Sequence, residues 1–212
     1  MEKTTTGLTI EYIKEHPYIK SCLKKELINY SSLARYIAKQ LKIEKKTSKE
    51  AILIAARRFQ QKLKKEETYE KQIKAIFAES EVAVRNKIAV LILEKNLNFD
   101  VVDSIQKTIR KESGLFYILE GTDNYTIITQ EKYSKLIENK FKNKLIKSHK
   151  AMALIDIKSS EKIEETPGVM AYITTLFAEN GVNILEFLSC WKETLFIIDS
   201  KDVNKALNFL KF

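Results

Sequence analysis

The residues of this sequence best suited to binding a ligand are Thr166, Pro167 and Gly168, which form a Thr-Pro-Gly run before an apolar segment. The chain has only two prolines and five glycines in 212 residues. Thr166 is expected to cap a helix, Pro167 to open it and Gly168 to leave its backbone accessible. Unpaired N–H groups at a helix N-terminus attract anions. The run therefore predicts a carboxylate site, and a longer surface loop before a well-capped helix is the alternative.

No other group of residues indicates catalysis or metal binding. Cys22 and Cys190 are far apart, and His16 and His149 are the only histidines that accompany them. This spacing gives neither a metal site nor a disulfide framework. The sequence also lacks a Ser/His/Asp order and a Gly-rich phosphate-binding loop. We therefore expect no enzyme activity, no catalytic residue, no metal and no cofactor.

Charge is concentrated at one end of the chain. The formal net charge is +9, and residues 1–75 contain 18 Lys and Arg against 9 Asp and Glu, so they carry all of it. This asymmetry favours a polyanionic partner such as DNA, although a solvated basic surface without a partner gives the same count. No run approaches the roughly 18 apolar residues of a membrane span, and no signal-peptide core is present. We expect a soluble, cytoplasmic protein without a membrane partner.

Three helices are predicted in the basic segment. The first covers residues 9–28, with a break at His16 and Pro17. In the second, an apolar face starts after a cap at Ser31 or Ser32 and consists of Leu33, Tyr36, Ile37 and Leu41. The third follows a capping box formed by Thr47 and Glu50. Its predicted buried stripe is Ile52, Ala55, Ala56, Phe59 and Leu63, and its predicted outer face is Lys49, Arg57, Gln60 and Lys64.

The basic segment has two interpretations. Three helices with a short turn before the last are compatible with a helix-turn-helix, with or without a wing. The DNA-binding candidates are then Lys49, Arg57, Arg58 and Lys64. The alternative is a helical bundle with a solvated basic face, since no Gly-turned wing follows the third helix. Residues 66–80 are expected to form a further helix, with Tyr69, Ile73 and Phe77 on one side.

The remainder of the chain contains an internal repeat. Residues 86–148 and 149–212 each predict strand, helix, strand, turn, strand and helix, from apolar runs at strand and helix spacing. A βαββα unit folds most simply as an antiparallel sheet with both helices on one face. Each copy lacks a final strand, for which 142–148 is a candidate in the first copy, while 81–85 is expected to complete an edge elsewhere. Matching Ala89 with Ala151 and Tyr125 with Leu195 makes the second copy eight residues longer, at 159–166.

These observations predict an α+β protein with three parts. An all-α, helix-turn-helix-like domain covers residues 1–79, and two ferredoxin-like βαββα(β) domains cover 80–148 and 149–212. The stretch TPGVMAYITTLFAENGVNI, followed by a hairpin ending in LFIIDSKD, resembles an ACT domain of the aspartokinase type. The first copy is similar to a degenerate partner in a tandem pair, and no kinase region accompanies the two.

The resemblance implies a small-molecule ligand, often an amino acid, held between the loop before the first helix of one domain and the second strand of an adjacent one. The positions that match the ligand-binding region are Glu165, Thr166, Pro167, Gly168, Val169, Asn180, Asn183 and Ile184. For Asn183, a role as a turn residue after Gly181 is an equally good explanation as a role in ligand binding.

Two functions remain open from the sequence. The first is a sensor that binds an amino acid, forms a homodimer or higher homo-oligomer through its ACT domains, and regulates transcription through a DNA-binding head. The alternative is a free-standing regulatory subunit of an aspartokinase-like biosynthetic enzyme, in which the basic head binds protein.

Overall fold

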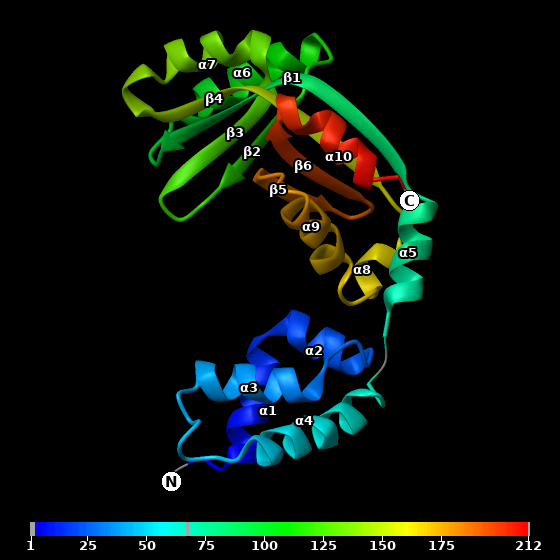
Figure 1. Cartoon of the computed structure of the whole chain (residues 1–212). Helices are drawn as coiled ribbons and strands as arrows, with labels where there is room; N and C mark the ends of the chain where they lie inside the picture. Colours follow the sequence, from blue (N-terminus) through cyan, green and yellow to red (C-terminus); the bar gives the residue numbers. More distant parts are fainter. Residues whose placement is uncertain (1–2, 67, 212) are drawn as a thin grey trace. The chain divides into compact units, whose positions relative to one another are not determined.

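The computed structural model describes residues 3–66 and 68–211. The chain divides into two compact units, Met1–Thr68 and Tyr69–Phe212, here called the helical unit and the sheet unit. Figure 1 shows helices alone in the helical unit, and a sheet with helices in the sheet unit. Within the described residues, no helix has both the length and the apolar character that crossing a membrane requires.

Over residues 3–66, the helical unit has four helices around one apolar core. Helix α4 is central, because α1 and α3 both pack along it and α2 contacts it as well. Its predicted buried stripe lies in this core as expected. The helices are α1 (Thr5–Glu15), α2 (Pro17–Lys24), α3 (Tyr30–Gln40) and α4 (Lys49–Leu63).

The helix starts in this unit differ from the sequence predictions. Asn29, and neither Ser31 nor Ser32, caps α3, because its side chain accepts a hydrogen bond from the Ser32 N–H. Ser48 caps α4 in place of the predicted box, while the Thr47 hydroxyl lies 3.1 Å from that of Thr5. A tertiary contact has displaced the cap by one residue. Several hydroxyl and amide residues in a row are each competent to cap, so sequence alone cannot choose among them.

Two side chains in the helical unit lie opposite to their predicted positions. Gln60 was expected on the outer face of α4 but is 1% exposed, and its amide donates to the Glu26 carboxylate at 3.0 Å. Tyr36 was expected in the core but is 47% exposed. A face defined by helical spacing is wide enough to include residues at its margin, and packing decides which of them are covered.

The sheet unit begins with a helix and then repeats one motif. Helix α5 (Glu70–Ala78) starts after the predicted residue 66, and Glu67 lies outside the described residues. The first motif is β1 (Glu81–Glu94), α6 (Phe99–Lys111), β2 (Phe116–Glu120), β3 (Asn124–Gln130) and α7 (Ser134–Lys140). The second is β4 (Leu145–Lys158), α9 (Val169–Glu179), β5 (Ile184–Cys190), β6 (Glu193–Asp199) and α10 (Val203–Phe209), with the short α8 (Lys162–Glu165) before α9.

The two motifs share their long strands. The six strands form one antiparallel sheet in the order β2-β3-β1-β4-β6-β5. The start of β4, residues 145–149, pairs with β1 beside β3. The strand predicted at 142–148 therefore begins only at 145, because residues 142–144 form a 3-10 helix. The start of β1, residues 81–85, pairs with β4 on the side away from β6. Each motif therefore supplies the fourth strand of the other. Residues 81–85 form no separate strand, because they continue directly into β1.

The repeat is visible in backbone conformation as well as in order. Lys87 and Ala151 each occupy the seventh position of a 14-residue strand, and both have a positive φ, 58° and 54°. Lys87 therefore corresponds to Ala151, and the predicted match of Ala89 with Ala151 is wrong by two residues. Since β3 and β6 begin at Asn124 and Glu193, the second motif is longer by five residues between these points, not by eight. The extra chain does lie between β4 and α9.

Helices cover one face of the bent sheet. Alternate residues of β1 pack against α6 and α7 in one core, and alternate residues of β4 pack against α5, α9 and α10 in another. The opposite face carries no helix. Its buried residues include Val90 and Leu154, and they are covered by side chains of the edge strands β2 and β5, among them Tyr117 and Leu188. The sheet is thus bent far enough that its edge strands cover part of the face without helices.

Candidate effector site

The loop from β4 to α9 places the Pro-Gly pair in a turn. Thr166 is extended, with φ −94° and ψ 109°, as a residue before proline should be. Gly168 has φ 90° and ψ −1°. These angles suit the third position of a type II turn, where glycine is favoured, and proline is favoured at the second position. The pair therefore turns the chain from α8 into α9.

This geometry corrects two sequence predictions. Thr166 does not cap α9, because its hydroxyl donates to the Lys162 carbonyl at 2.8 Å and so belongs to the end of α8. Pro167 does not occupy the first turn of α9, which begins at Val169. The position before the helix is held by Gly168, without a side-chain cap. The left-handed backbone at Gly168 favours glycine. Lack of space is not the reason, because an added Cβ would meet only the Ile73 side chain, at 3.6 Å.

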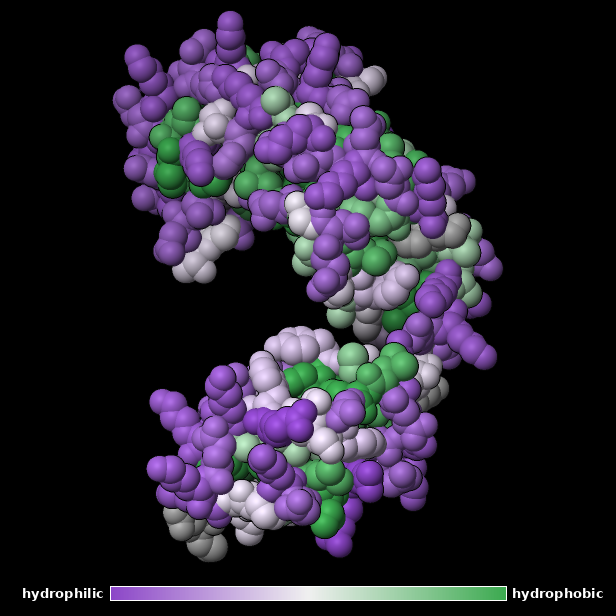
Figure 2. Space-filling view, viewed as in Figure 1, coloured by the Kyte–Doolittle hydropathy of each residue, from purple (hydrophilic) through white to green (hydrophobic). Residues whose placement is uncertain are grey.

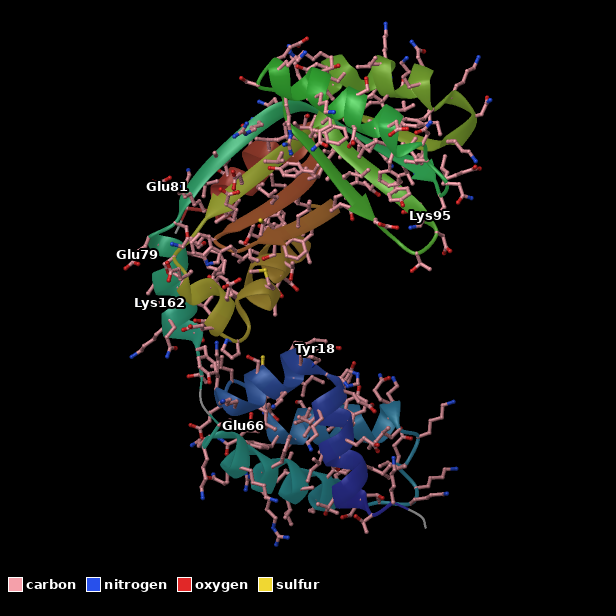
Figure 3. All side chains as sticks on the ribbon, turned by 180° about the vertical axis from the view of Figure 1, so that it is seen from behind. Tyr18, Glu66, Glu79, Glu81, Lys95 and Lys162 are labelled. Carbon is pink, nitrogen blue, oxygen red and sulfur yellow. The ribbon has the colours of Figure 1, made fainter. Side chains whose placement is uncertain are left out.

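The first turn of α9 is the candidate anion-binding element of the loop. The N–H groups of a first helical turn have no partner within the helix, and Gly168 before it is exposed and offers no capping side chain. The Val169 side chain is buried in the core with α5, so only its amide can contact a ligand. Glu165 and Pro167 are exposed beside it. Figure 3 shows Lys162 of α8 near α5, whose C-terminal cap is Glu79.

Hydroxyl groups gather at the other end of the loop. The Ser159 hydroxyl lies 2.8 Å from that of Ser80, which also donates to the Ile76 carbonyl. Among the described residues, Ser160 Oγ and Thr194 Oγ1 are buried atoms without a hydrogen-bond partner, and Thr194 is 1% exposed. Buried polar atoms are normally paired, directly or through water or a ligand. The sequence did not indicate these residues, because Thr194 stands in an apolar strand and serines are common in loops.

The predicted facing residues lie at the opposite end of α9. Asn180 follows the helix, and its amide donates to the Leu176 carbonyl at 2.8 Å, so it closes the helix. Asn183 is exposed in the turn before β5, and Ile184 begins that strand, half-buried against the core. Eleven residues of helix separate the two groups by about 16 Å. One copy of the chain does not bring the two halves of the predicted site together through α9.

The corresponding loop of the first motif is closed. It consists of residues 95–98, and the Asn98 side chain caps α6 by accepting from the Asp100 N–H at 3.0 Å. In the first motif, the equivalent of the candidate anion-binding element is therefore capped by a side chain of the protein itself. This agrees with the absence of a Pro-Gly pair from that copy.

Acidic groups lie on the helix-free face of the sheet. Burial raises the pKa of Asp156 on β4, and the charge of Glu193 adds to this effect. Asp156 Oδ1 is buried, and no partner for it exists among the described residues. Burial also raises the pKa of Glu186 on β5 and of Tyr117 on β2. In the described part of the chain, no group of three or more His, Cys, Asp or Glu side chains is placed to hold a metal ion.

The four DNA-binding candidates occupy different environments on α4. Lys64 forms an ion pair of 2.6 Å with Glu26. The Arg57 guanidinium lies over the Tyr30 ring, 5.2 Å from its centre, and Arg58 follows it at the surface. Lys49 stands at the start of the helix, in a depression that also includes Arg35 and Lys39.

The connection from α3 to α4 covers residues 41–48, longer than the three or four residues of a helix-turn-helix turn. Figure 2 shows hydrophilic side chains over most of the visible face of each unit.

Comparison with known proteins identifies one part of the chain. Residues 147–211 match the family model of the ACT domain, and the match leaves out the first motif. No curated protein matches the sequence at a significant level.

Solved structures are similar to part of this chain at low sequence identity. The aspartate kinase of Clostridium acetobutylicum has a TM-score of 0.51 and 19% identity, over 61% of this chain and 33% of that one. The present chain thus spans about a third of the length of that enzyme. The regulatory subunit of aspartate kinase from Thermus thermophilus has a TM-score of 0.47 and 14% identity, over 61% of this chain and 93% of that one. A Vibrio cholerae protein of unknown function has a TM-score of 0.49 and 12% identity, over 68% and 96%. Residues 147–211 are accordingly an ACT domain, and 61% of the chain shares its fold with a 33% portion of an aspartate kinase.

Proposed function

We propose that this chain is a ligand-responsive regulator whose ACT domain binds a free amino acid. The carboxylate is held by the N–H groups of the first turn of α9, and the Ser160 hydroxyl, which has no described partner, lies in the same loop. The two βαββα motifs act as a tandem pair of ACT domains, of which only the second keeps a ligand site. The observation that carries the proposal is the start of α9, which has no side-chain cap and lies beside an exposed Gly168.

The site is completed by a second copy of the chain. Within one copy, Asn183 and Ile184 lie about 16 Å from the first turn of α9. In a homodimer or higher homo-oligomer, the same residues of another copy can face the loop, where an Asn side chain binds the ammonium group and Ile184 borders the ligand side chain. A homo-oligomer is therefore part of the proposal.

The output of the regulator is DNA binding by the helical unit, through Lys49, Arg57, Arg58 and Lys64. An amino acid can control this output only as far as it binds one arrangement of the oligomer more tightly than another. The net charge of residues 1–75 and the arginines at the surface of α4 support this assignment.

A thermal-shift screen of the full chain with each of the twenty amino acids tests the ligand. A ligand present at 100 times its dissociation constant stabilises the folded state by about 2.7 kcal/mol. We expect one amino acid, or a chemically related few, to raise the melting temperature. A flat response across all twenty contradicts the proposal.

Substitution at Gly168 tests the position of the site. Asp and Asn both tolerate a left-handed backbone better than other residues. Gly168→Asp places a carboxylate at the helix start and should abolish the ligand-induced shift. Gly168→Asn has nearly the same shape without the charge and should keep part of it. Equal shifts in wild type and Gly168→Asp would show that the ligand binds elsewhere.

A regulatory subunit of an amino-acid biosynthetic enzyme is the second candidate. It is favoured by apolar side chains at the surface of the helical unit, where Tyr18 is 66% and Leu27 73% exposed, because such residues suit a protein partner. The long connection before α4 also departs from a helix-turn-helix. Co-purification of one enzyme, together with no DNA binding at low salt, would decide for this candidate.

A further inference from the structure

A depression in the helical unit lies where the first turn of α3 meets the middle of α4. It has a volume of about 300 Å³. Both arginines of α4 line it, and Tyr30, the first residue of α3, borders it. Its lining is completed by Glu26, Gln60 and Gln61.

The single carboxylate of the depression is already neutralised. Glu26 Oε1 lies 2.6 Å from Lys64 Nζ and accepts from the Gln60 amide at 3.0 Å. These two contacts lower the pKa of Glu26, the bond from Lys64 having the larger effect, so it stays ionised and paired. Gln60 is buried and also accepts from the Gln61 amide, which fixes its orientation. Glu26 therefore lines the depression with its charge compensated by Lys64 and its oxygen bonded to Gln60.

The two guanidinium groups are left with their charge available. Within residues 3–66 and 68–211, no ion pair involves Arg57 or Arg58. Arg57 lies over the face of Tyr30. Stacking engages the flat face of a guanidinium and leaves the in-plane N–H donors free to form paired hydrogen bonds.

The start of α3 adds further donors beside the ring. Asn29 caps only the Ser32 N–H with its side chain. The N–H groups of the first turn have no partner within the helix. The first residue of α3 and two arginines line one shallow depression, and a helix start beside two guanidinium groups suits a tetrahedral oxyanion with several acceptor atoms.

We propose that Tyr30, Arg57 and Arg58 form a binding pocket for a phosphoryl group, supplied by the backbone of a nucleic acid. This inference rests on the proposed DNA-binding output and narrows it. Arg57 and Arg58 bind the phosphate oxygens, and Tyr30 positions Arg57. Lys64 stays paired with Glu26, so this inference removes Lys64 from the four residues proposed above to contact DNA.

Salt-dependent binding of the full chain to a labelled DNA duplex tests the pocket. Each lost phosphate contact reduces the slope of log affinity against log salt by about one. We expect this loss for Arg57→Gln and for Arg58→Gln. Arg57→Lys keeps the charge but loses the planar fork, so it should weaken binding and leave the slope nearly unchanged. Tyr30→Leu should act in the same way as Arg57→Lys.

Lys45→Gln is the matched control, since Lys45 is exposed in the same unit and lies outside the depression. Circular dichroism of each variant excludes unfolding as the cause. If Arg57→Gln and Arg58→Gln change the slope no more than Lys45→Gln does, the pocket is not a phosphate site.

A titration of inorganic phosphate and pyrophosphate, followed by the NMR signals of the arginine side chains, separates the pocket from the proposed function. Shifts at Arg57 and Arg58 together with duplex binding support both. Shifts without binding of any duplex at low salt keep the phosphoryl site but overturn nucleic acid as its source, and the DNA-binding output falls with it. Duplex binding that is insensitive to Arg57→Gln and Arg58→Gln overturns the pocket and leaves the output standing.

Discussion

Gly168 is the residue on which the candidate site depends, for a reason that its sequence neighbours did not indicate. Its backbone is left-handed at φ 90°, and α9 begins at the next residue. The Cβ of any other residue would disfavour this conformation, while the space around it is open except for Ile73. Glycine is therefore required for the turn itself, and the open helix start is a consequence of that turn.

Gly168→Ala should destabilise the sheet unit without a clash. A left-handed conformation costs a residue with a Cβ about 1–2 kcal/mol, and the nearest side chain would be in ordinary contact. Urea unfolding of the full chain measures this loss. Gly168→Asn should lose less, because asparagine tolerates the conformation better. Equal losses for Ala and Asn would contradict the backbone explanation.

Asp156 should make stability depend on pH. Burial raises its pKa, with Glu193 adding to the effect and Arg85 and Lys158 opposing it. The folded state then binds the proton more tightly than the unfolded chain does, so the stabilisation is complete at acid pH and is lost as pH rises through the folded pKa.

Asp156→Asn should remove the loss of stability that accompanies ionisation of Asp156 as the pH rises. We expect its free energy of unfolding to exceed that of wild type at pH 7 and to approach it at pH 3, as measured by urea denaturation. Asp123→Asn, in the exposed turn between β2 and β3, is the control and should differ little at either pH. A difference for Asp156→Asn that is the same at pH 3 and pH 7 would exclude titration of Asp156 as its origin.

At the scale of elements, α5 belongs to the sheet unit. Ile73 and Phe77 are buried in the core formed with β4 and α9, and Phe77 stacks with Tyr172 at 5.8 Å between ring centres. The sequence predicted the helix and its apolar side but left open what that side covers. Because its partners lie about 80 residues further along the chain, helical spacing could not identify them.

Phe77→Ala should therefore destabilise the sheet unit. Truncating a buried phenylalanine typically costs about 3–5 kcal/mol. Lys71→Ala, on the exposed side of the same helix, should leave stability within about 0.5 kcal/mol of wild type. Calorimetry of the full chain measures both. If Phe77→Ala behaves like Lys71→Ala, α5 is a linker that the rest of the unit does not need.

At the scale of the whole molecule, regulation requires that effector and target influence each other. If an amino acid changes the affinity for DNA by some factor, DNA must change the affinity for that amino acid by the same factor. Titration calorimetry with the amino acid found by the screen, with and without a DNA duplex, measures this. We expect a change of about 5–150-fold, the usual range of coupling. Unchanged affinity would mean that the two units act independently.

The sequence by itself determined the repeat, the strand and helix order of both motifs, the basic head and the position of the extra loop. These follow from local spacing of apolar residues, from charge and from the rarity of proline and glycine, which act over a few residues. It could not determine the register of the repeat, because β4 contains two alanines, Ala151 and Ala153, and the apolar pattern accepts either as the equivalent of Ala89. Burial distinguishes them, since Ala89 and Ala153 are both buried and Ala151 is exposed. Which of several adjacent polar residues caps a helix was also beyond it.

Only the tertiary structure decided how the ends of β1 and β4 each complete the sheet of the other motif, why Gly168 is needed, and which basic residues are not engaged in ion pairs within the described chain. Lys64 and Arg57 are similar in the sequence, yet one is paired with Glu26 and the other lies over Tyr30. Such differences arise from contacts between segments that are distant along the chain, and no local pattern records them. The physical reason is that charge and spacing belong to a residue and its neighbours, while the partner of a side chain is set by the fold.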